Sequence, residues 1–192
     1  MKRTATPRND PRVERTRKAL FESLLVLIVE KGYDATTVRD VLDRADVGRA
    51  TFYAHFYNKE DLLLGRMSVF QLDVGNGAQQ SQSPTMPDVT RLFEHVARFR
   101  NLGLALRGTP VLEESLKIAR ADLLASFRKF LRGERTRLCA KHADSELLAQ
   151  FLTGALLHLL LWWLDEGMPE PPSAMNRWFA ELGQRALTPS RA

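Results

Sequence analysis

A short stretch between residues 36 and 64 brings together basic, hydroxyl and aromatic side chains in an order that suits contact with a polyanion. A helix is predicted to begin at Arg49, and Phe52 and Phe56, four residues apart, point to one side of it. The opposite side is short, basic, hydroxyl-rich and aromatic, as in a helix that reads the major groove of DNA. The side chains left on that outer side are Arg49, Ala50, Thr51, Tyr53 and His55.

A second helix is predicted before this recognition helix, and a tight turn joins the two. Thr36 and Thr37 can cap it, and its apolar residues form a single stripe that must be buried. We expect Gly48 to supply the backbone freedom that the turn needs. Asn58 then caps a further helix that begins at Lys59. The apolar stripe of the first of these helices consists of Val38, Val41, Leu42 and Ala45.

The order of these pieces resembles the TetR/AcrR family of bacterial transcriptional repressors. The DNA-binding half of that family has a Thr-Thr start, a Gly or Ser turn, a T-F-Y-x-H/Y-F recognition helix and an N-K-E-x-L start of the next helix. This sequence has these motifs at Thr36-Thr37, at Gly48, at residues 51–56 and at residues 58–62, and the resemblance covers roughly residues 12–70. It implies an all-α fold, with an N-terminal three-helix helix-turn-helix DNA-binding domain and a C-terminal helical ligand-binding and dimerisation domain.

Composition and charge divide the chain into three segments. Residues 1–11 lack periodicity and are expected to form a disordered basic arm, which either follows DNA or contributes only bulk charge. Met1 to Lys18 contain seven Lys or Arg and two acids, and the whole chain has a net charge of +5 and a pI of 9.7, which favour a polyanion partner. Residues 12–58 are predicted to form the helix-turn-helix DNA-binding domain, and residues 59–192 a C-terminal helical regulatory and dimerisation domain.

Periodicity predicts four further helices in the C-terminal half. They are expected from residue 88 to about 107, from 109 to 133, from 145 to 166 and from 173 onward. The last of them should bury one stripe of side chains against the rest of the chain. That stripe is expected to consist of Met175, Trp178, Phe179, Leu182 and Ala186.

The end of the sequence is similar to one TetR subgroup, which finishes with an apolar helix that contains tryptophan, a Gly-x-Pro turn and a closing helix. Here these features are Trp162-Trp163 and Gly167-Met168-Pro169. In the family, the last two long helices form a four-helix bundle with the same pair from a second subunit, so the resemblance implies a homodimer. The run Phe151–Leu164 is apolar almost all round, which independently favours contact with a second subunit.

The resemblance gives each side chain of the interface a role that its chemistry allows. Arg49 can make a bidentate contact with guanine, and Ala50 can touch a thymine methyl group. Thr51 and Tyr53 offer hydroxyl groups to phosphate, and Arg39 can reach a base or a phosphate from the preceding helix. Phosphate contacts are also expected of Thr36, Thr37, His55 and Lys59.

Regulation in this family implies a small-molecule effector, whose identity the sequence does not give. Candidates for its pocket are aromatic or half-polar side chains of the C-terminal half, although aromatic residues at helical spacing are usually core. They are Phe93, Phe99, Phe127, His158 and Trp162. We therefore expect a repressor that the effector releases from a palindromic operator in double-stranded DNA. A co-activator or adaptor of the same fold, acting mainly through protein contacts, is the alternative. The sequence fixes neither the operator and its target genes nor the choice between repression and activation.

Other classes of function find little support. The sequence has no phosphate-binding glycine loop, no Cys-x-x-Cys and no nucleophile elbow, so we expect no enzyme, no metal site and no cofactor. The single cysteine, Cys139, fits a reducing cytoplasm; beside Arg137, Lys141 and His142 it can alternatively sense oxidants, which the sequence does not decide. No secretory signal is visible, and the 14-residue run Phe151–Leu164 is shorter than the roughly 20 residues that cross a bilayer. A cytoplasmic protein without membrane contact is expected.

Overall fold

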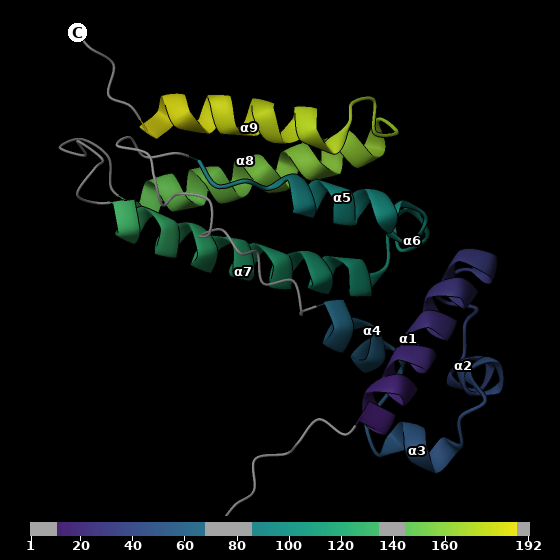
Figure 1. Cartoon of the computed structure of the whole chain (residues 1–192). Coiled ribbons are helices and arrows are strands. Elements are labelled where there is room, and N and C mark those ends of the chain that lie inside the picture. Colours follow the sequence, from purple (N-terminus) through teal and green to yellow (C-terminus); the bar gives the residue numbers. More distant parts are fainter. Residues whose placement is uncertain (1–10, 68–85, 135–144, 188–192) are drawn as a thin grey trace, which may run out of the picture. The chain divides into compact units, whose positions relative to one another are not determined.

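The chain is all-α, as predicted, in the computed structural model, which describes residues 11–67, 86–134 and 145–187. Within these ranges there are nine helices and no strand (Figure 1). Residues 1–10 of the predicted basic arm and Cys139 with its predicted redox role lie outside the described residues. The helices are α1 (Pro11–Lys31), α2 (Val38–Ala45), α3 (Arg49–Tyr53), α4 (Lys59–Met67), α5 (Thr90–Arg98), α6 (Arg100–Ala105), α7 (Pro110–Glu134), α8 (Ser145–Asp165) and α9 (Pro172–Leu187).

The chain divides into two compact units, each of which is described by itself. The first contains α1 to α4 together with residues 101–115, which form most of α6 and the first turns of α7. The second contains α5, the remainder of α7, α8 and α9. Because α4 packs against α1, it groups with the first unit, whereas the predicted domain boundary at residue 58 placed it with the C-terminal half. The boundary between functional domains stays a prediction.

In the first unit, α1 provides the core against which the shorter helices pack. It contacts both α2 and α4. Apolar side chains at three- and four-residue spacing form its buried face, as an amphipathic helix requires. The buried apolar residues of the first four helices are Leu20, Leu24, Leu27, Ile28, Val41, Phe52, Leu62 and Leu63. Gly32, at φ 85°, follows the end of α1 in a left-handed conformation that glycine adopts without steric penalty.

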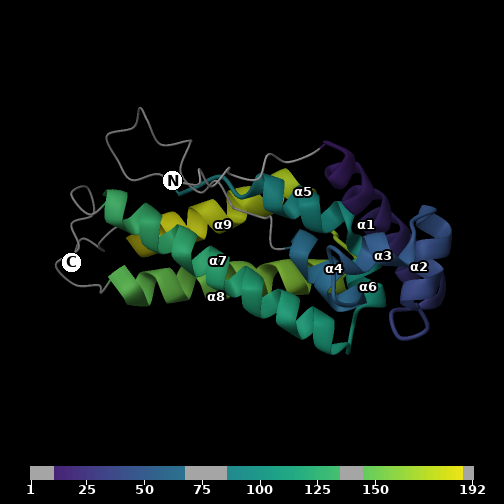
Figure 2. The same ribbon diagram turned by 90° about the horizontal axis from the view of Figure 1, so that it is seen from below.

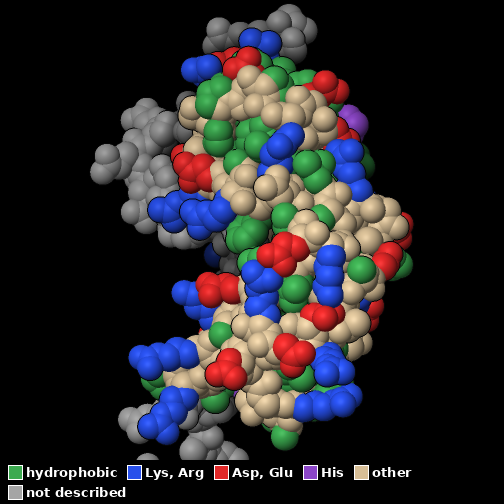
Figure 3. Space-filling model, turned by 90° about the vertical axis from the view of Figure 1, so that its right-hand side faces the viewer, with side chains coloured by type: hydrophobic (Ala, Val, Ile, Leu, Met, Phe, Trp, Pro, Cys, Tyr) green, Lys and Arg blue, Asp and Glu red, His purple; other side chains and the backbone are tan. Residues whose placement is uncertain are grey.

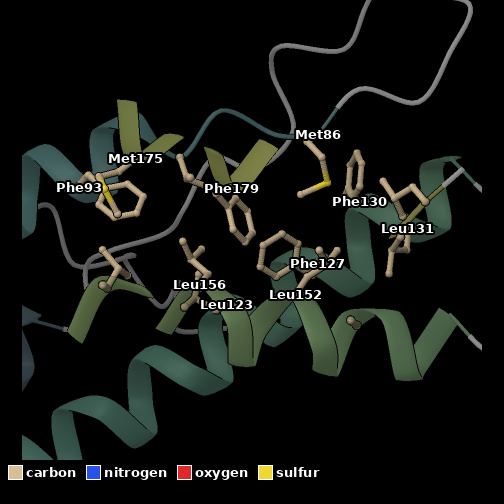
Figure 4. Packing of buried hydrophobic residues seen from close by; sticks show 14 of the residues in the cluster. Met86, Phe93, Leu123, Phe127, Phe130, Leu131, Leu152, Leu156, Met175 and Phe179 are labelled. Atoms are coloured by element: carbon tan, nitrogen blue, oxygen red, sulfur yellow. The ribbon is translucent and has the colours of Figure 1, made fainter. Parts of the chain in front are cut away.

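In the second unit, α5, α7, α8 and α9 share one apolar core. In Figure 1 the axes of α7, α8 and α9 lie roughly parallel, with α8 antiparallel to the other two, whereas the perpendicular view of Figure 2 shows α7 and α9 inclined to each other. Figure 4 shows side chains from these helices meeting between the ribbons, among them Phe127 and Phe179, whose ring centroids lie 6.1 Å apart. At Gly183 the packing is so close that an added Cβ would lie 2.5 Å from Cε of Met86. The segment before α5 therefore contacts α9 at a position that has no side chain.

The predicted single helix from residue 88 to 107 is wrong in one respect, because two helices occupy this range. The N-cap of the first is Val89, and the preceding Asp88 accepts a hydrogen bond at its Oδ1 from the backbone N–H of Thr90 at 2.8 Å. The helix is interrupted at Phe99 (φ −102°, ψ 21°), and α6 begins at the next residue. Phe99 is flanked by Arg98 and Arg100, and none of the three breaks helices by its own propensity. The interruption therefore arises from tertiary structure, and it coincides with the boundary between the two units.

The predicted inward stripe of α9 is only partly correct. Met175 and Phe179 are buried in the core of the second unit, as expected. Trp178, Leu182 and Ala186 are exposed instead, with Leu182 63% exposed. The helix turns a neighbouring face inward because Gly183 lets the backbone approach closely, as described above. The residues that α9 buries are Ala174, Met175, Phe179, Gly183 and Leu187.

The helix α8 also has two apolar faces, one buried and one exposed. The buried face consists of Ala149, Leu152, Thr153, Leu156, Leu160 and Trp163. The exposed apolar side chains are Leu147, Phe151, Leu161 and Trp162. With 21 residues, α8 is the one helix in the described ranges that is long and apolar enough to cross a membrane, so the expected exclusion by length does not hold for the helix as a whole. Core helices of soluble proteins pass the same test, and the inner face of α8 is part of a protein core.

Candidate nucleic-acid interface

The short helix α3 presents the side chains expected of a recognition helix. Phe52 and Phe56 are both buried, which confirms the predicted inner side, but α3 ends at Tyr53, so Phe56 follows the helix instead of lying on it as predicted. The outer side is open: Arg49, Ala50 and Thr51 are exposed, and Tyr53 is 48% exposed. The Arg49 guanidinium lies 5.7 Å from the centroid of the Tyr53 ring, within the range of a cation–π contact. Because the two residues are four apart on one helix, this contact holds both side chains on the outer side.

The turn between α2 and α3 is built differently from the prediction. The left-handed residue is Asp46, at φ 52°, and its backbone N–H donates to the carbonyl of Leu42. Gly48 has φ −68° and ψ 146°, a conformation open to any residue, so the expected need for glycine there is wrong. Gly48 instead precedes α3, where its carbonyl accepts hydrogen bonds from the N–H groups of Thr51 and Phe52 at 3.0 and 3.2 Å. Aspartate tolerates the left-handed region better than most residues, which explains its place in this turn.

The two threonines before α2 have different roles. Thr37 is the N-cap: its hydroxyl accepts from the N–H of Asp40, and the Asp40 carboxylate accepts from the backbone N–H of Thr37 at 2.7 Å. A hydrogen bond from Lys31, followed by those from Thr37, holds the pKa of Asp40 well below its usual range. Thr36, in contrast, is only 1% exposed and its hydroxyl donates to the carbonyl of Gly32 at 2.7 Å. Of the two, only Thr37 is exposed, and because its hydroxyl also donates to the Asp40 carboxylate at 2.6 Å, a phosphate contact would have to compete with that bond.

Lys59 does not extend into solvent, as a simple phosphate contact would. Its Nζ donates to the carbonyl oxygens of Tyr33 at 2.7 Å and Thr36 at 2.8 Å. The same ammonium lies 4.1 Å from the centroid of the Tyr33 ring, within cation–π distance. These contacts join the first residue of α4 to the turn between α1 and α2. The structure thus places Lys59 differently from the sequence-based expectation.

The remaining two predicted DNA contacts lie on either side of α3. The side chain of Arg39 on α2 is 90% exposed and approaches the Asp43 carboxylate at 3.7 Å. His55 is half-buried in the turn after α3, and its ring edge meets Phe56 at a centroid distance of 6.3 Å. Figure 3 looks at the side of the molecule that carries α1 and α2, where Lys and Arg side chains alternate with carboxylates and form no patch of one sign.

Two residues beside this surface were missed by the sequence analysis. Tyr57 follows Phe56 and is 89% exposed, with its backbone N–H held by the Asp61 carboxylate at 2.9 Å. The Arg17 guanidinium on α1 lies 5.9 Å from the centroid of the Phe56 ring, and its Nε is buried without a hydrogen-bond partner. An exposed aromatic next to a buried one was a visible signal for Tyr57, whereas the proximity of Arg17 depends on tertiary structure alone.

The five candidates for an effector pocket do not gather in one place. Phe93 and Phe127 are fully buried in the core, where Phe93 meets Trp163 edge-on at 5.3 Å. Phe99 is half-buried and stacks on His95 at 4.6 Å. His158 and Trp162 lie on the exposed face of α8. Within the described ranges, no three His, Cys, Asp or Glu side chains lie close enough together to hold a metal ion. The pocket stays a prediction.

A capped helix packed on α1, a tight turn and a short exposed helix whose inner side is buried define a helix-turn-helix DNA-binding unit. Models of two protein families match the chain: "Bacterial regulatory proteins, tetR family" over residues 20–65, and "Transcriptional regulator C-terminal region" over residues 90–184. The chain belongs to the TetR family of bacterial transcriptional regulators. The proteins of this family that it matches are regulators and not enzymes.

Individual relatives agree with this assignment. The regulator YxbF of Bacillus subtilis is 29% identical over 179 residues, which are 90% of this chain and 46% of that protein. TetC of transposon Tn10 from Escherichia coli is 25% identical over 159 residues, covering 76% of this chain and 79% of that protein. The match spans less than half the length of YxbF and of two further regulators from Bacillus subtilis, YvkB and YdeS. A TetR-family regulator from Syntrophomonas wolfei shares the fold, with a TM-score of 0.71 at 19% identity over 91% of this chain and 95% of that one.

Proposed function

We propose that this chain is a transcriptional repressor that binds a palindromic operator as a homodimer and releases it when a small-molecule effector binds. The observation that carries the proposal is the outer side of α3. Arg49 and Tyr53 are exposed there, while Phe52 and Phe56 fix the helix to the core from behind. A folded protein that did not bind a partner would have no reason to hold a guanidinium and a phenol side by side on so short a helix.

The roles proposed for single residues follow from their exposure. Arg49 reads guanine through a bidentate contact, and Ala50 leaves room for a base-pair edge beside it. Thr51 and Tyr53 donate hydroxyl groups to phosphates, and Thr37 joins them from the N-terminus of α2. Arg39, on α2, contacts a base or a phosphate, and His55, in the turn after α3, contacts a phosphate. In this proposal Thr36 and Lys59 serve the interface from within the protein, because their polar groups are already bound to backbone carbonyls.

The exposed faces of α8 and α9 support the homodimer. On α8 the apolar side chains Leu147, Phe151 and Trp162 are exposed, and Gly154 lies in the middle of the same stripe. A Cβ added at Gly154 would meet nothing within 4 Å, so the helix surface there is open to close approach by another helix. On α9, Trp178 and Leu182 are exposed in the same way. Exposed apolar stripes on two neighbouring helices are typical of a subunit interface.

Support for an effector, and for repression, comes only from similar proteins. The fold resembles that of FadR from Bacillus subtilis, described in complex with stearoyl-CoA (TM-score 0.61, 19% identity), and of SmeT, the repressor of an efflux pump in Stenotrophomonas maltophilia (TM-score 0.67, 19% identity). It also resembles DhaS, an operon activator (TM-score 0.70, 14% identity). Activation, or an adaptor role through protein contacts, is therefore the second candidate. An adaptor would bind no genomic fragment, so DNA selection separates it from a DNA-binding regulator.

The proposal is tested by selecting bound fragments from genomic DNA and then comparing two variants on the selected operator. Arg49→Ala should lose about 1–3 kcal/mol of binding free energy and relax the base preference at one operator position. Tyr53→Phe keeps the ring beside Arg49 but loses the hydroxyl, so it should weaken all sequences alike, by about 1 kcal/mol. No bound fragment for the unaltered protein would refute the function, and equal losses on every sequence for both variants would refute the division of roles.

A further inference from the structure

The side chain of Lys59 makes an unusual number of contacts for a residue at the start of an exposed helix. Its ammonium donates to two carbonyl oxygens, those of Tyr33 and Thr36, and lies against the face of the Tyr33 ring. All three contacts are to the single turn that connects α1 to α2, more than 20 residues earlier in the chain. The side chain therefore links the first turn of α4 directly to the turn between α1 and α2.

Besides Lys59, the turn is held by its own local hydrogen bonds and by the Lys31–Asp40 ion pair, 2.7 Å long, between the end of α1 and the first turn of α2. The N–H of Thr36 donates to the carbonyl of Tyr33 at 3.1 Å, and the Thr36 hydroxyl donates to the carbonyl of Gly32 at 2.7 Å. The Tyr33 carbonyl thus accepts two hydrogen bonds, one from inside the turn and one from Lys59. Hydrogen bonds from an ammonium are stronger than neutral ones, so Lys59 adds a stronger constraint on this turn than its local backbone and hydroxyl hydrogen bonds do.

The environment of Tyr33 fits a fixed arrangement. Its ring is buried, and burial first, then Glu60, raises the pKa of its hydroxyl well above the usual value. Tyr33 is therefore neutral at any physiological pH, and it offers Lys59 an uncharged aromatic face. The next residues along the chain are Thr37, the cap of α2, and then α2 itself, whose far end leads into α3. Whatever fixes this turn also fixes the start of the DNA-reading segment.

We propose that Lys59 is a positioning residue for DNA binding: its ammonium locks the α1–α2 turn to the first turn of α4, so that Thr37 and α2 are correctly placed before DNA arrives. This inference rests on the proposed DNA-binding function and changes the role of Lys59 within it. Two of the three N–H donors of the ammonium are used inside the protein, which explains why the side chain is not free to follow a phosphate backbone. A displacement of the first turn of α4 would be passed to the N-terminus of α2 through the same contacts.

The test compares Lys59→Met, which keeps the length of the side chain but has no donor, with Lys59→Gln, which keeps a neutral donor. Two quantities are measured on the full chain: hydrogen exchange of the turn, residues 33–37, without DNA, and the dependence of operator affinity on salt concentration. Lys129→Met, at an exposed lysine of α7, is the control for loss of one positive charge. Far-UV circular dichroism checks that each variant is folded.

In Lys59→Met the turn should exchange about tenfold faster or more, because both charge-assisted hydrogen bonds from Lys59 to it are gone. Operator affinity should fall, while the slope of log affinity against log salt stays within error of the unaltered protein. Lys59→Gln should restore most of the slow exchange and much of the affinity. If Lys59→Met does not fold, Lys59→Gln alone decides, because a phosphate contact would lose its charge in that variant as well.

Two results overturn the inference. One is a salt slope that decreases by about 0.9 in either Lys59 variant, the value expected for one lost phosphate contact, together with unchanged exchange of the turn. The other is turn exchange in Lys59→Met no faster than in Lys129→Met. Failure of the proposed function gives a different result, since the unaltered protein would then bind no DNA while the exchange measurement on the turn would still decide whether the lock exists.

Discussion

Two adjacent tryptophans offer a direct comparison of a buried and an exposed position on α8. Trp163 is 1% exposed, its Nε1–H donates to the carbonyl of Glu170 at 2.8 Å, and its ring meets Phe93 edge-on. Trp162, the preceding residue, is 40% exposed. The same substitution, Trp→Phe, can therefore be made at both. Trp163→Phe leaves the Glu170 carbonyl without its donor, worth about 1–3 kcal/mol, and leaves a void where the larger indole was, worth about 1–2 kcal/mol more.

We expect Trp163→Phe to lower the free energy of unfolding by about 2–5 kcal/mol. Trp162→Phe should change it by no more than about 0.5 kcal/mol at low protein concentration, because a partly exposed side chain loses little. At high protein concentration Trp162→Phe should lose stability relative to the unaltered chain if the exposed face of α8 joins two subunits. Urea unfolding followed by far-UV circular dichroism at two protein concentrations measures all of this.

The comparison can fail in two ways that refute different steps. If Trp162→Phe is as destabilising as Trp163→Phe in dilute protein, the assignment of the buried and exposed faces of α8 is incorrect. If Trp163→Phe changes the free energy of unfolding by less than about 0.5 kcal/mol, neither the hydrogen bond to Glu170 nor the contact with Phe93 stabilises the core as argued. An effect of Trp162→Phe that is independent of protein concentration would contradict the proposed subunit contact alone.

Three further predictions concern a histidine and two glycines. Burial, and to a smaller extent Arg98, lowers the pKa of His95 to about 4 from 6.5. Between these two pH values the unfolded chain binds more protons than the folded chain, so the free energy of unfolding should fall as the pH drops from 6.5 to 4. The expected loss is about 1–2 kcal/mol, because His95 is only half-buried. Urea unfolding at several pH values measures this loss, with His95→Gln as the control. Gly183→Ala should lose about 1–3 kcal/mol in a thermal melt, because Met86 must move to admit the methyl group. Gly48→Ala should keep or gain stability, by up to about 1 kcal/mol in the same assay, since its φ of −68° suits alanine.

The parts of the fold that the sequence predicted correctly are those with local causes. The start of α7 follows from Thr109, whose hydroxyl accepts a hydrogen bond from the N–H of Leu112 at 3.4 Å, and the extent of α8 from residue 145 follows from apolar spacing. The inner side of α3 follows from the spacing of Phe52 and Phe56, which leaves no alternative face. In each case the information lies within one turn of helix, so it can be read without knowing what the segment packs against.

The parts that the sequence did not predict have non-local causes. The interruption at Phe99 has no helix-breaking residue, and the inward face of α9 depends on the contact between Gly183 and Met86. The case of Lys59 is the most informative. A lysine after a helix cap suits a phosphate as well as it suits a pair of carbonyls, because the same N–H groups donate to both. Whether Lys59 binds a phosphate or backbone carbonyls depends on the position of Tyr33, in the turn between α1 and α2, and the sequence near Lys59 does not give that position.

The distribution of charge separates two parts of the proposed DNA binding. Residues 1–18 hold seven basic and two acidic side chains, which equals the entire net charge of +5, so the rest of the chain is balanced. Around α2 the balance is local: Lys31, Arg39 and Arg44 each lie within 4.0 Å of a carboxylate. Among the described residues Arg49 makes no such ion pair, and its guanidinium lies against the Tyr53 ring. Sequence-independent attraction to DNA should therefore depend mostly on the N-terminal segment, and sequence preference on Arg49, because charge that is already neutralised by a neighbouring carboxylate releases few counterions.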